Sequence, residues 1–195
     1  MSDRLSQILH FLEAIDPFKS IERATYVSNQ KQHESDSDHT WHMAMFALLL
    51  HKEIAFEVDV GKVLTLILIH DLCEILAGDT FAYTPEHNDQ ERELEAAKQV
   101  FALLPPDLNN ELLNGWKEFT LGSSPEARFA RALDRMQGLA QNVFSAGRVW
   151  RERHVTQAMS RELNRDAQEF DPTIGDIFEK LFQRAVDEEL WPSAK

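Results

Sequence analysis

The segment HDLCEILAGD, residues 70–79, places a histidine and an aspartate side by side directly after the apolar run VLTLILI. Two further acidic residues, Glu74 and Asp79, follow within the same segment. Charged groups beside so much aliphatic surface are unfavourable unless a partner compensates them. His39 and Asp134 lie in apolar neighbourhoods elsewhere in the chain. Imidazole and carboxylate groups together favour a borderline divalent metal over Ca²⁺, so Mn²⁺, Co²⁺, Fe²⁺, Ni²⁺ and Zn²⁺ are the candidate ions.

The spacing of these groups decides which of them can reach a single ion. His70 and Asp71 are adjacent and point about 100° apart on a helix, so both meet one ion only at the helix edge. Glu74 lies four residues after His70 and three after Asp71, on the same face. This spacing places Glu74 to work beside the metal. The His70–Asp71 pair also has a structural interpretation as a buried ion pair.

Structural alternatives stay open for the other acidic residues. Glu74 is also suited to orient a histidine ligand instead of acting on a substrate. Asp79 is suited to serve the turn after a glycine. Asp134 is suited to a helix ion pair with Arg131 or Arg135.

Helices are the elements that must hold these residues. Apolar residues recur at helical spacing along most of the chain, and glycine and proline are too sparse for an all-β fold. Ser37 or Asp38 is expected to cap the helix that carries His39, after a loop-rich stretch over residues 16–38. The predicted helices cover about 5–15, 39–56, 60–76, 89–104, 107–119, 123–147, 155–168 and 173–190. We predict an all-α fold, a single compact helical bundle over residues 1–195, with a core at about 5–145 and C-terminal helices at about 155–190.

The overall composition narrows the class of partner. With 195 residues, 43% hydrophobic and 27% charged, the chain is typical of one globular domain. The net charge of −13 argues against a duplex nucleic acid as partner. The lone Cys73 excludes an internal disulfide, and the N-terminal segment lacks the apolar core of a signal peptide. Apolar runs are too short to span a membrane, so we expect a cytoplasmic protein with no membrane partner.

Three segments together resemble the HD-domain metal-dependent phosphohydrolases. ESDSDHTWHMAMFALLL is similar to that family's Glu-x-x-x-acid-His-x-aromatic opening, and HDLCEILAGD to its His-Asp-x-x-Glu-x-x-x-Gly-Asp centre. SPEARFARALDRMQ is similar to the family's closing helix. The resemblance runs from about residue 5 to about residue 145 and is strongest to the bacterial 5'-deoxynucleotidases and related eukaryotic HD-domain-containing proteins.

The resemblance implies a role for each of the residues named first. His39, His70, Asp71 and Asp134 match the ligands of one divalent transition metal. Glu74 matches the residue that orients or deprotonates the attacking water.

The resemblance also implies residues that contact the substrate. Asp79 matches a residue near the leaving group or the sugar, and Arg23 an arginine that meets the nucleotide. Family members place a tryptophan beside this arginine or a few residues later, where it helps to exclude a ribose 2'-hydroxyl, whereas this chain has Tyr26. We therefore expect weaker selection for deoxyribose. Arg131, one turn before Asp134, is a speculative phosphate contact.

The function implied is hydrolysis of (deoxy)nucleoside 5'-monophosphates to a nucleoside and phosphate. One alternative is a metal-binding or nucleotide-sensing module without turnover, and another is a hydrolase of a different phosphorylated small molecule. Glu74 and Asp79 argue against the sensor, because a sensor needs no group that activates water. We expect a small-molecule nucleotide as substrate and a homodimer as the assembly.

Overall fold

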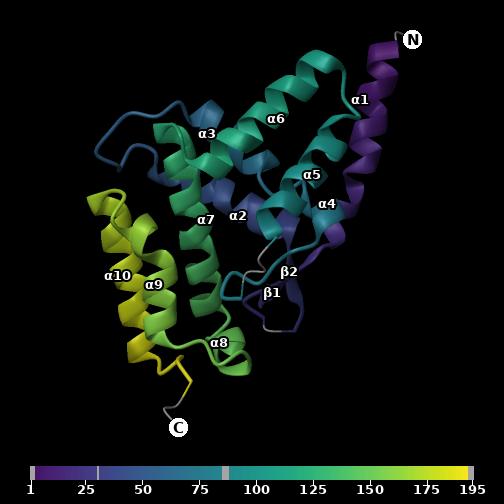
Figure 1. The fold of residues 1–195 in the computed structure, drawn as a ribbon. Helices are drawn as coiled ribbons and strands as arrows, with labels where there is room; N and C mark the ends of the chain where they lie inside the picture. The colour runs from purple at the N-terminus through teal and green to yellow at the C-terminus, as the bar shows by residue number, and fades with distance from the viewer. Residues whose placement is uncertain (1–2, 30, 85–87, 193–195) are drawn as a thin grey trace.

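The computed structural model describes residues 3–29, 31–84 and 88–192 (Figure 1). Helices dominate, which confirms the all-α prediction. The helices are α1 (Asp3–Ala14), the 3-10 helix η1 (Asp16–Ser20), α2 (Asp36–Leu50), α3 (Val60–Ile69), α4 (Glu74–Ala77), α5 (Asp89–Phe101), α6 (Pro106–Leu121), α7 (Pro125–Phe144), α8 (Arg148–Glu152), α9 (Gln157–Gln168) and α10 (Pro172–Asp187).

Helix α7 is the central element of the bundle. A serine caps its N-terminus, because the Ser124 side chain accepts a hydrogen bond from the backbone of Ala127, and Pro125 occupies the first turn. Helices α9 and α10 pack together against α7, and α2, α3 and α6 also contact it (Figure 1). Side chains such as Leu133 and Met136 are fully buried at its centre. Any charged group on α7 that faces inward therefore lies within the core.

Residues 16–38 are more ordered than the predicted loop-rich stretch. They form η1 and a short antiparallel hairpin of β1 (Glu22–Tyr26) and β2 (His33–Ser35), in which Tyr26 pairs with His33. These strands are too short and polar to show an apolar alternation in the sequence. The predicted caps Ser37 and Asp38 were wrong. Ser35 caps α2 instead, in a capping box where Ser35 Oγ accepts from Asp38 N at 3.2 Å and Asp38 Oδ2 accepts from Ser35 N at 3.1 Å.

The predicted helix over residues 60–76 is interrupted where its chemistry begins. Helix α3 ends at Ile69, a tight turn follows over 70–73, and the short α4 begins at Glu74. The carbonyl of His70 accepts a hydrogen bond from Trp116 Nε1 at 2.9 Å, and the Glu74 amide bonds to Asp71 O instead. The backbone of His70 keeps right-handed helical dihedrals, and hydrogen bonds to the residue three positions earlier replace the α-helical pattern between Leu72 and Glu74.

The remaining boundaries differ in smaller ways. The two prolines at 105 and 106 separate α5 from α6, and α6 continues to Leu121, further than predicted. The helix α8 was not predicted, because five residues carry no periodic pattern.

In the described part of the chain, no helix is both long and apolar enough to cross a membrane. Cys73 is buried as expected, and burial followed by the charge of Asp71 raises the pKa of its thiol.

Candidate metal centre and active site

Two buried histidines face each other at the middle of the bundle. His39 comes from α2 and His70 from the turn after α3, and their ring centroids lie 5.6 Å apart. His39 Nδ1 contacts Gln137 Oε1 at 2.6 Å, and His70 Nδ1 contacts the carbonyl of Ile67 at 2.7 Å. These contacts protonate each Nδ1 and leave each Nε2 with a free lone pair. Both Nε2 atoms are buried without a hydrogen-bond partner.

Two carboxylates lie against these bare nitrogen atoms. Asp71 Oδ2 is 2.9 Å from His70 Nε2 and 3.9 Å from His39 Nε2. Asp134 Oδ1, from α7, is 3.2 Å from His39 Nε2. All four predicted ligands therefore come together from α2, the turn at residues 70–73 and α7. Lone pairs of neutral imidazole aimed at carboxylate oxygens repel unless a proton or a metal cation lies between them. Two imidazole nitrogens and two carboxylates that converge in this way are a donor set that fits a divalent metal of the borderline class.

A buried series of hydrogen-bonded side chains holds the Nδ1 side of His39, and the sequence analysis missed it. Gln137 Nε2 donates to Glu34 Oε1 at 2.6 Å, and Thr25 Oγ1 donates to Glu34 Oε2 at 2.7 Å. Gln137 and Glu34 are almost fully buried. Hydrogen bonds of this kind orient histidine ligands in metal sites. The available signal was the spacing, since Gln137 follows Asp134 by one helical turn.

Arg23 joins the metal-binding residues to a second group of carboxylates. Its Nη1 lies 3.0 Å from Asp71 Oδ2, 3.1 Å from Asp36 Oδ1 and 3.7 Å from Asp79 Oδ1. Oxygen atoms of Asp36, Glu74 and Asp79 lie within 4.8 Å of one another. The predicted residues Glu74, Asp79 and Arg23 are thus brought to the site. Asp36 was missed, although it precedes His39 by three residues on one helix face.

The electrostatics of the site separate the carboxylates into two kinds. Burial tends to raise the pKa of Asp71, but His70 and Arg23 outweigh it and hold the pKa at about 2. Burial likewise opposes ionisation of Asp134, and the adjacent His39 side chain together with the charge of Arg135 lowers its pKa. Burial and the charges of Asp71 and Asp36 instead raise the pKa of Glu74 far above its ordinary value. The site thus places two carboxylates with lowered pKa values, Asp71 and Asp134, beside Glu74, whose pKa is raised.

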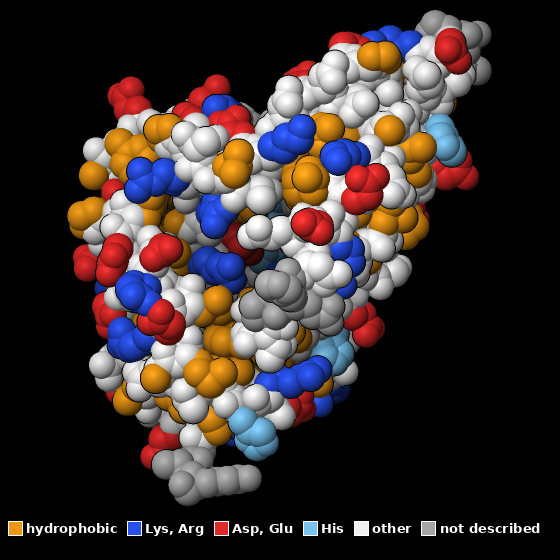
Figure 2. All heavy atoms as spheres, in the orientation of Figure 1, with side chains coloured by type: hydrophobic (Ala, Val, Ile, Leu, Met, Phe, Trp, Pro, Cys, Tyr) orange, Lys and Arg blue, Asp and Glu red, His pale blue; other side chains and the backbone are white. Residues whose placement is uncertain are grey.

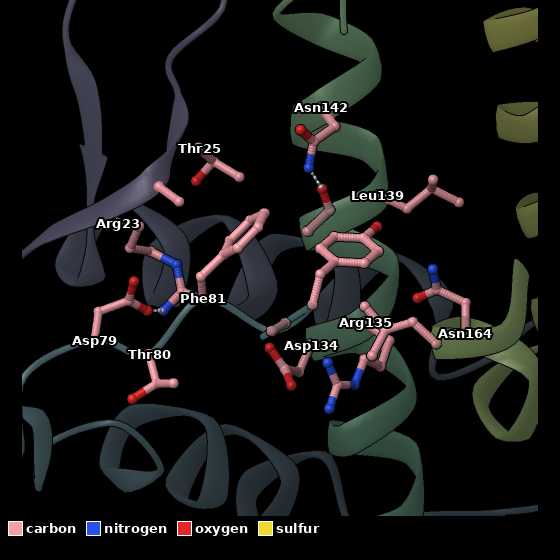
Figure 3. A pocket seen from close by; sticks show the side chains of 15 residues that line it. Arg23, Thr25, Asp79, Thr80, Phe81, Asp134, Arg135, Leu139, Asn142 and Asn164 are labelled. Carbon is pink, nitrogen blue, oxygen red and sulfur yellow. Dashed lines mark hydrogen bonds and ion pairs between the residues drawn. The ribbon is translucent and has the colours of Figure 1, made fainter. Parts of the chain in front are cut away.

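Two connected cavities open onto this centre. A cleft of about 560 Å³ has His70, Asp71 and Glu74 in its wall and continues along α7 past several arginines. Figure 2 shows a hollow with acidic and histidine side chains in its depth and with Lys and Arg side chains beside it. A smaller cavity lies on the other side, lined by Arg23, Asp79 and residues from α7 and α9 (Figure 3). Only residues 134, 135 and 163 line both cavities among those described.

Two residues predicted to contact the substrate lie differently from expectation. The Tyr26 side chain is buried, its hydroxyl donates to Glu152 Oε2 at 3.2 Å, and Arg148 stacks on its ring at 3.7 Å. Tyr26 lines neither cavity in the described part of the chain, so its placement does not support contact with a sugar. Arg131 lines the cleft, but its Nη1 donates to the carbonyls of Phe119 and Thr120.

Comparisons with known proteins agree with this geometry. The family model described as HD domain matches residues 15–174, which extends beyond the predicted resemblance into α10. The human protein named 5'-deoxynucleotidase HDDC2 is 34% identical over 137 residues, which cover 69% of this chain and 66% of that protein. The bovine protein of the same name is 35% identical over 137 residues, covering 69% and 65%. The chain thus spans slightly under two thirds of the length of these curated relatives.

Solved structures are similar to this chain over nearly its whole length. A crystal structure described as a predicted metal-dependent phosphohydrolase from Magnetospirillum magnetotacticum MS-1 matches with a TM-score of 0.90 and 36% identity, covering 97% of this chain and 96% of that one. A conserved hypothetical protein from Pyrococcus furiosus, at a TM-score of 0.56 and 22% identity, shares the fold. Since the family model covers most of the chain and these relatives share its helices, the chain belongs to the HD domain family.

Proposed function

We propose that this protein is a metal-dependent phosphomonoesterase that hydrolyses (deoxy)nucleoside 5'-monophosphates to a nucleoside and phosphate. The observation that carries the proposal is the convergence of His39 Nε2 and His70 Nε2, buried and without hydrogen-bond partners, on Asp71 and Asp134 at a cleft. The curated relatives named 5'-deoxynucleotidases support this class of substrate.

The residues of the centre would hold one divalent transition metal, Mn²⁺, Co²⁺, Fe²⁺, Ni²⁺ or Zn²⁺. His39 and His70 would supply imidazole nitrogens, and Asp71 and Asp134 carboxylate oxygens. Such an ion, when bound, supplies Lewis-acid stabilisation of phosphoryl charge and favours deprotonation of the attacking water.

The chain's own residues then position the reactants. Glu74 lies next to Asp71 with Oε2 buried and unpaired, which suits it to align the attacking water and to exchange a proton with it. Asp79 faces the smaller cavity and is placed to contact the sugar or the leaving oxygen. Arg23, held by Asp36 and Asp71, fixes the direction of these carboxylates and adds one positive charge beside the phosphoryl group.

A phosphate-release panel tests the proposal. The purified protein is loaded separately with Mn²⁺, Co²⁺, Ni²⁺ and Zn²⁺ and assayed with the deoxy- and ribonucleoside 5'-monophosphates of each base. We expect turnover that chelation abolishes, and loss of turnover and of bound metal in Asp71→Ala. Nucleotide binding without phosphate release with every metal would overturn the proposal and leave a sensing module as the better description.

The proposal includes the state in which the enzyme acts, a cytoplasmic homodimer in which residues 1–195 form one unit. Exposed leucines on one face of α1, Leu5, Leu9 and Leu12, and exposed apolar side chains on α2, Trp41 and Leu49, support self-association. Light scattering coupled to size exclusion measures the assembly, and a monomeric mass at micromolar concentration would overturn this part.

A further inference from the structure

The guanidinium of Arg135 lies where the two cavities meet. Arg135 follows Asp134 on α7, is half-buried and lines both cavities. Figure 3 shows its guanidinium beside the Asp134 carboxylate at one end of the smaller cavity. Within the described ranges its guanidinium forms no hydrogen bond or ion pair, and its charge acts on the neighbouring Asp134, whose pKa it helps to lower. A partly desolvated cation without a partner at the junction of two cavities is suited to an anionic ligand.

The other arginines around the centre already have partners. Arg23 Nη1 is shared by Asp36 and Asp71 at 3.1 and 3.0 Å. Arg131 donates to two backbone carbonyls at the end of α6. Arg128 stacks over the ring of Phe170 at 5.2 Å from its centroid. The N–H donors of Arg128 stay available, but Arg128 lies six residues before Asp134 on α7 and lines only the cleft. Among the described arginines with available donors, Arg135 is therefore the one that lies next to Asp134 and lines both cavities.

The charge of the site requires such a cation. Five carboxyl groups surround the place where a phosphate would bind: Asp36, Asp71, Glu74, Asp79 and Asp134. Arg23 is the cation that contacts this group directly, through Asp36, Asp71 and Asp79. A phosphate monoester at neutral pH carries nearly two negative charges. One divalent ion and the Arg23 guanidinium carry less positive charge than the carboxylates and the phosphate carry negative charge, even with a proton on Glu74. A second guanidinium offsets part of the remaining repulsion.

We propose that Arg135 binds the phosphate group of the substrate, at the point where the two cavities meet the metal centre. The inference rests on the proposed function for the identity of the ligand as a phosphate monoester. The planar guanidinium offers two parallel N–H donors that match two phosphate oxygens, whereas a lysine ammonium acts as a point charge. Arg135 is thus the residue of α7 that contacts the anion, in place of Arg131.

Binding of inorganic phosphate to the Mn²⁺-loaded protein, measured by calorimetry, tests the inference directly. Arg135→Gln should weaken phosphate binding by roughly tenfold or more, the loss expected when a charge-assisted contact disappears. Arg135→Lys should recover part of this loss, because it restores the charge without the bidentate geometry. Arg131→Gln is the competing variant on the same helix face, one turn away. An unchanged affinity in Arg135→Gln, or a loss found only in Arg131→Gln, would overturn the inference.

Three further readouts separate a phosphate contact from a structural effect. Deoxyadenosine, which has no phosphate, should inhibit Arg135→Gln and the wild type equally. At saturating Mn²⁺, metal content should stay the same as in the wild type and the melting temperature close to it, although the loss of the Arg135 charge beside Asp134 lowers the affinity for the metal. If deoxyadenosine binding or metal content falls together with phosphate affinity, Arg135 acts through the structure and the inference is wrong.

The phosphate measurement also keeps this inference distinct from the proposed function. It needs no turnover, so Arg135-dependent phosphate binding in a protein that hydrolyses no nucleotide would support the inference and overturn the function. Turnover with kcat/KM unaffected by Arg135→Gln would support the function and overturn the inference.

Discussion

His39 and Gln137 form a buried hydrogen bond of 2.6 Å that links a metal-binding histidine to the interior of the bundle. Gln137 Nε2 donates to Glu34 at 2.6 Å, so the amide oxygen must face His39, and His39 Nδ1–H must be the donor. The bond therefore selects the tautomer in which Nε2 is bare and turned to Asp134, 3.2 Å away. A side chain that touches neither metal nor substrate thus prepares the ligand.

Replacing Gln137 should weaken metal binding without removing any ligand. We expect Gln137→Leu to lower Mn²⁺ affinity roughly 10–100-fold, the range found when supporting partners of metal ligands are lost. Competition against a chromogenic chelator measures this affinity. Gln141→Leu is the matched control, because Gln141 makes a buried 2.6 Å hydrogen bond to the Tyr26 carbonyl one turn further along α7. Equal metal affinities for the two variants would contradict the assigned role.

Chelation should destabilise the fold as well as stop turnover. Without an ion, His39 Nε2 and His70 Nε2 remain buried and unpaired beside ionised carboxylates. A ligand that binds only the native state raises stability in proportion to the logarithm of its concentration over Kd. We expect a lower Tm with chelator, restored by Mn²⁺ or Co²⁺, and no chelator effect in Asp71→Ala. A melt that chelator leaves unchanged in the wild type would argue against the centre.

Glu74 should act on the chemical step more than on binding. Its Oε2 is buried without a partner, next to the metal-binding residues. We expect Glu74→Gln to keep its metal and to lose roughly 10²–10⁴-fold in kcat, as is typical when a positioned proton-transfer group is removed. Steady-state kinetics and metal analysis on one preparation measure both quantities. Metal loss with a normal kcat at saturating metal would make Glu74 a supporting residue instead.

Sugar selectivity should not depend on Tyr26. The phenol faces Glu152 and Arg148 and lies outside both cavities, so neither removing its hydroxyl nor enlarging the ring changes the wall of the site. We expect the ratio of kcat/KM for dAMP to that for AMP to be the same in the wild type, Tyr26→Phe and Tyr26→Trp. Asp79→Asn, whose side chain lines the smaller cavity, should change this ratio. If this ratio changed in Tyr26→Trp but not in Asp79→Asn, Tyr26 and not Asp79 would be the residue that contacts the sugar.

An ion pair at the other end of the bundle should make stability depend on pH. Lys62 Nζ of α3 lies 2.7 Å from Glu118 Oε1 of α6, and this contact lowers the pKa of Glu118 below its ordinary value of 4.5. A carboxyl group with a lowered pKa stabilises the native state above its ordinary pKa and loses this effect as the pH falls through the lowered value. The pair is partly exposed, so we expect at most about 1 kcal/mol at pH 7.

Thermal unfolding of Glu118→Gln against the wild type measures this dependence. The variant should melt lower at pH 7, and the difference should be smaller at about pH 3, because Glu118 is protonated as the pH falls below 4.5 and through its lowered pKa. Glu111→Gln removes the same charge from an exposed position on the same helix and should show no such difference. An equal Tm difference at both pH values would show that packing, not the ion pair, explains the effect.

The sequence by itself determined the all-α class and predicted the four proposed metal ligands, which the structure brings together. Apolar residues at helical spacing mark α7 and α10 without reference to any other part of the chain, because periodicity is a local property. His39, His70, Asp71 and Asp134 stand out because histidine and aspartate beside apolar runs need compensation wherever the helices pack. Glu74 followed from its spacing to Asp71.

Only the tertiary structure decided how these residues are supported and what lies around them. Trp116 donates a hydrogen bond to the His70 carbonyl from a position 46 residues away, and Gln137 reaches His39 across 98 residues. Arg131 and Arg135 are equally plausible phosphate contacts in the sequence. In the structure, Arg131 donates to the carbonyls at the end of α6, whereas Arg135 lines the cleft without such a contact. Such pairings depend on contacts between segments distant in sequence, which no local pattern of residues contains.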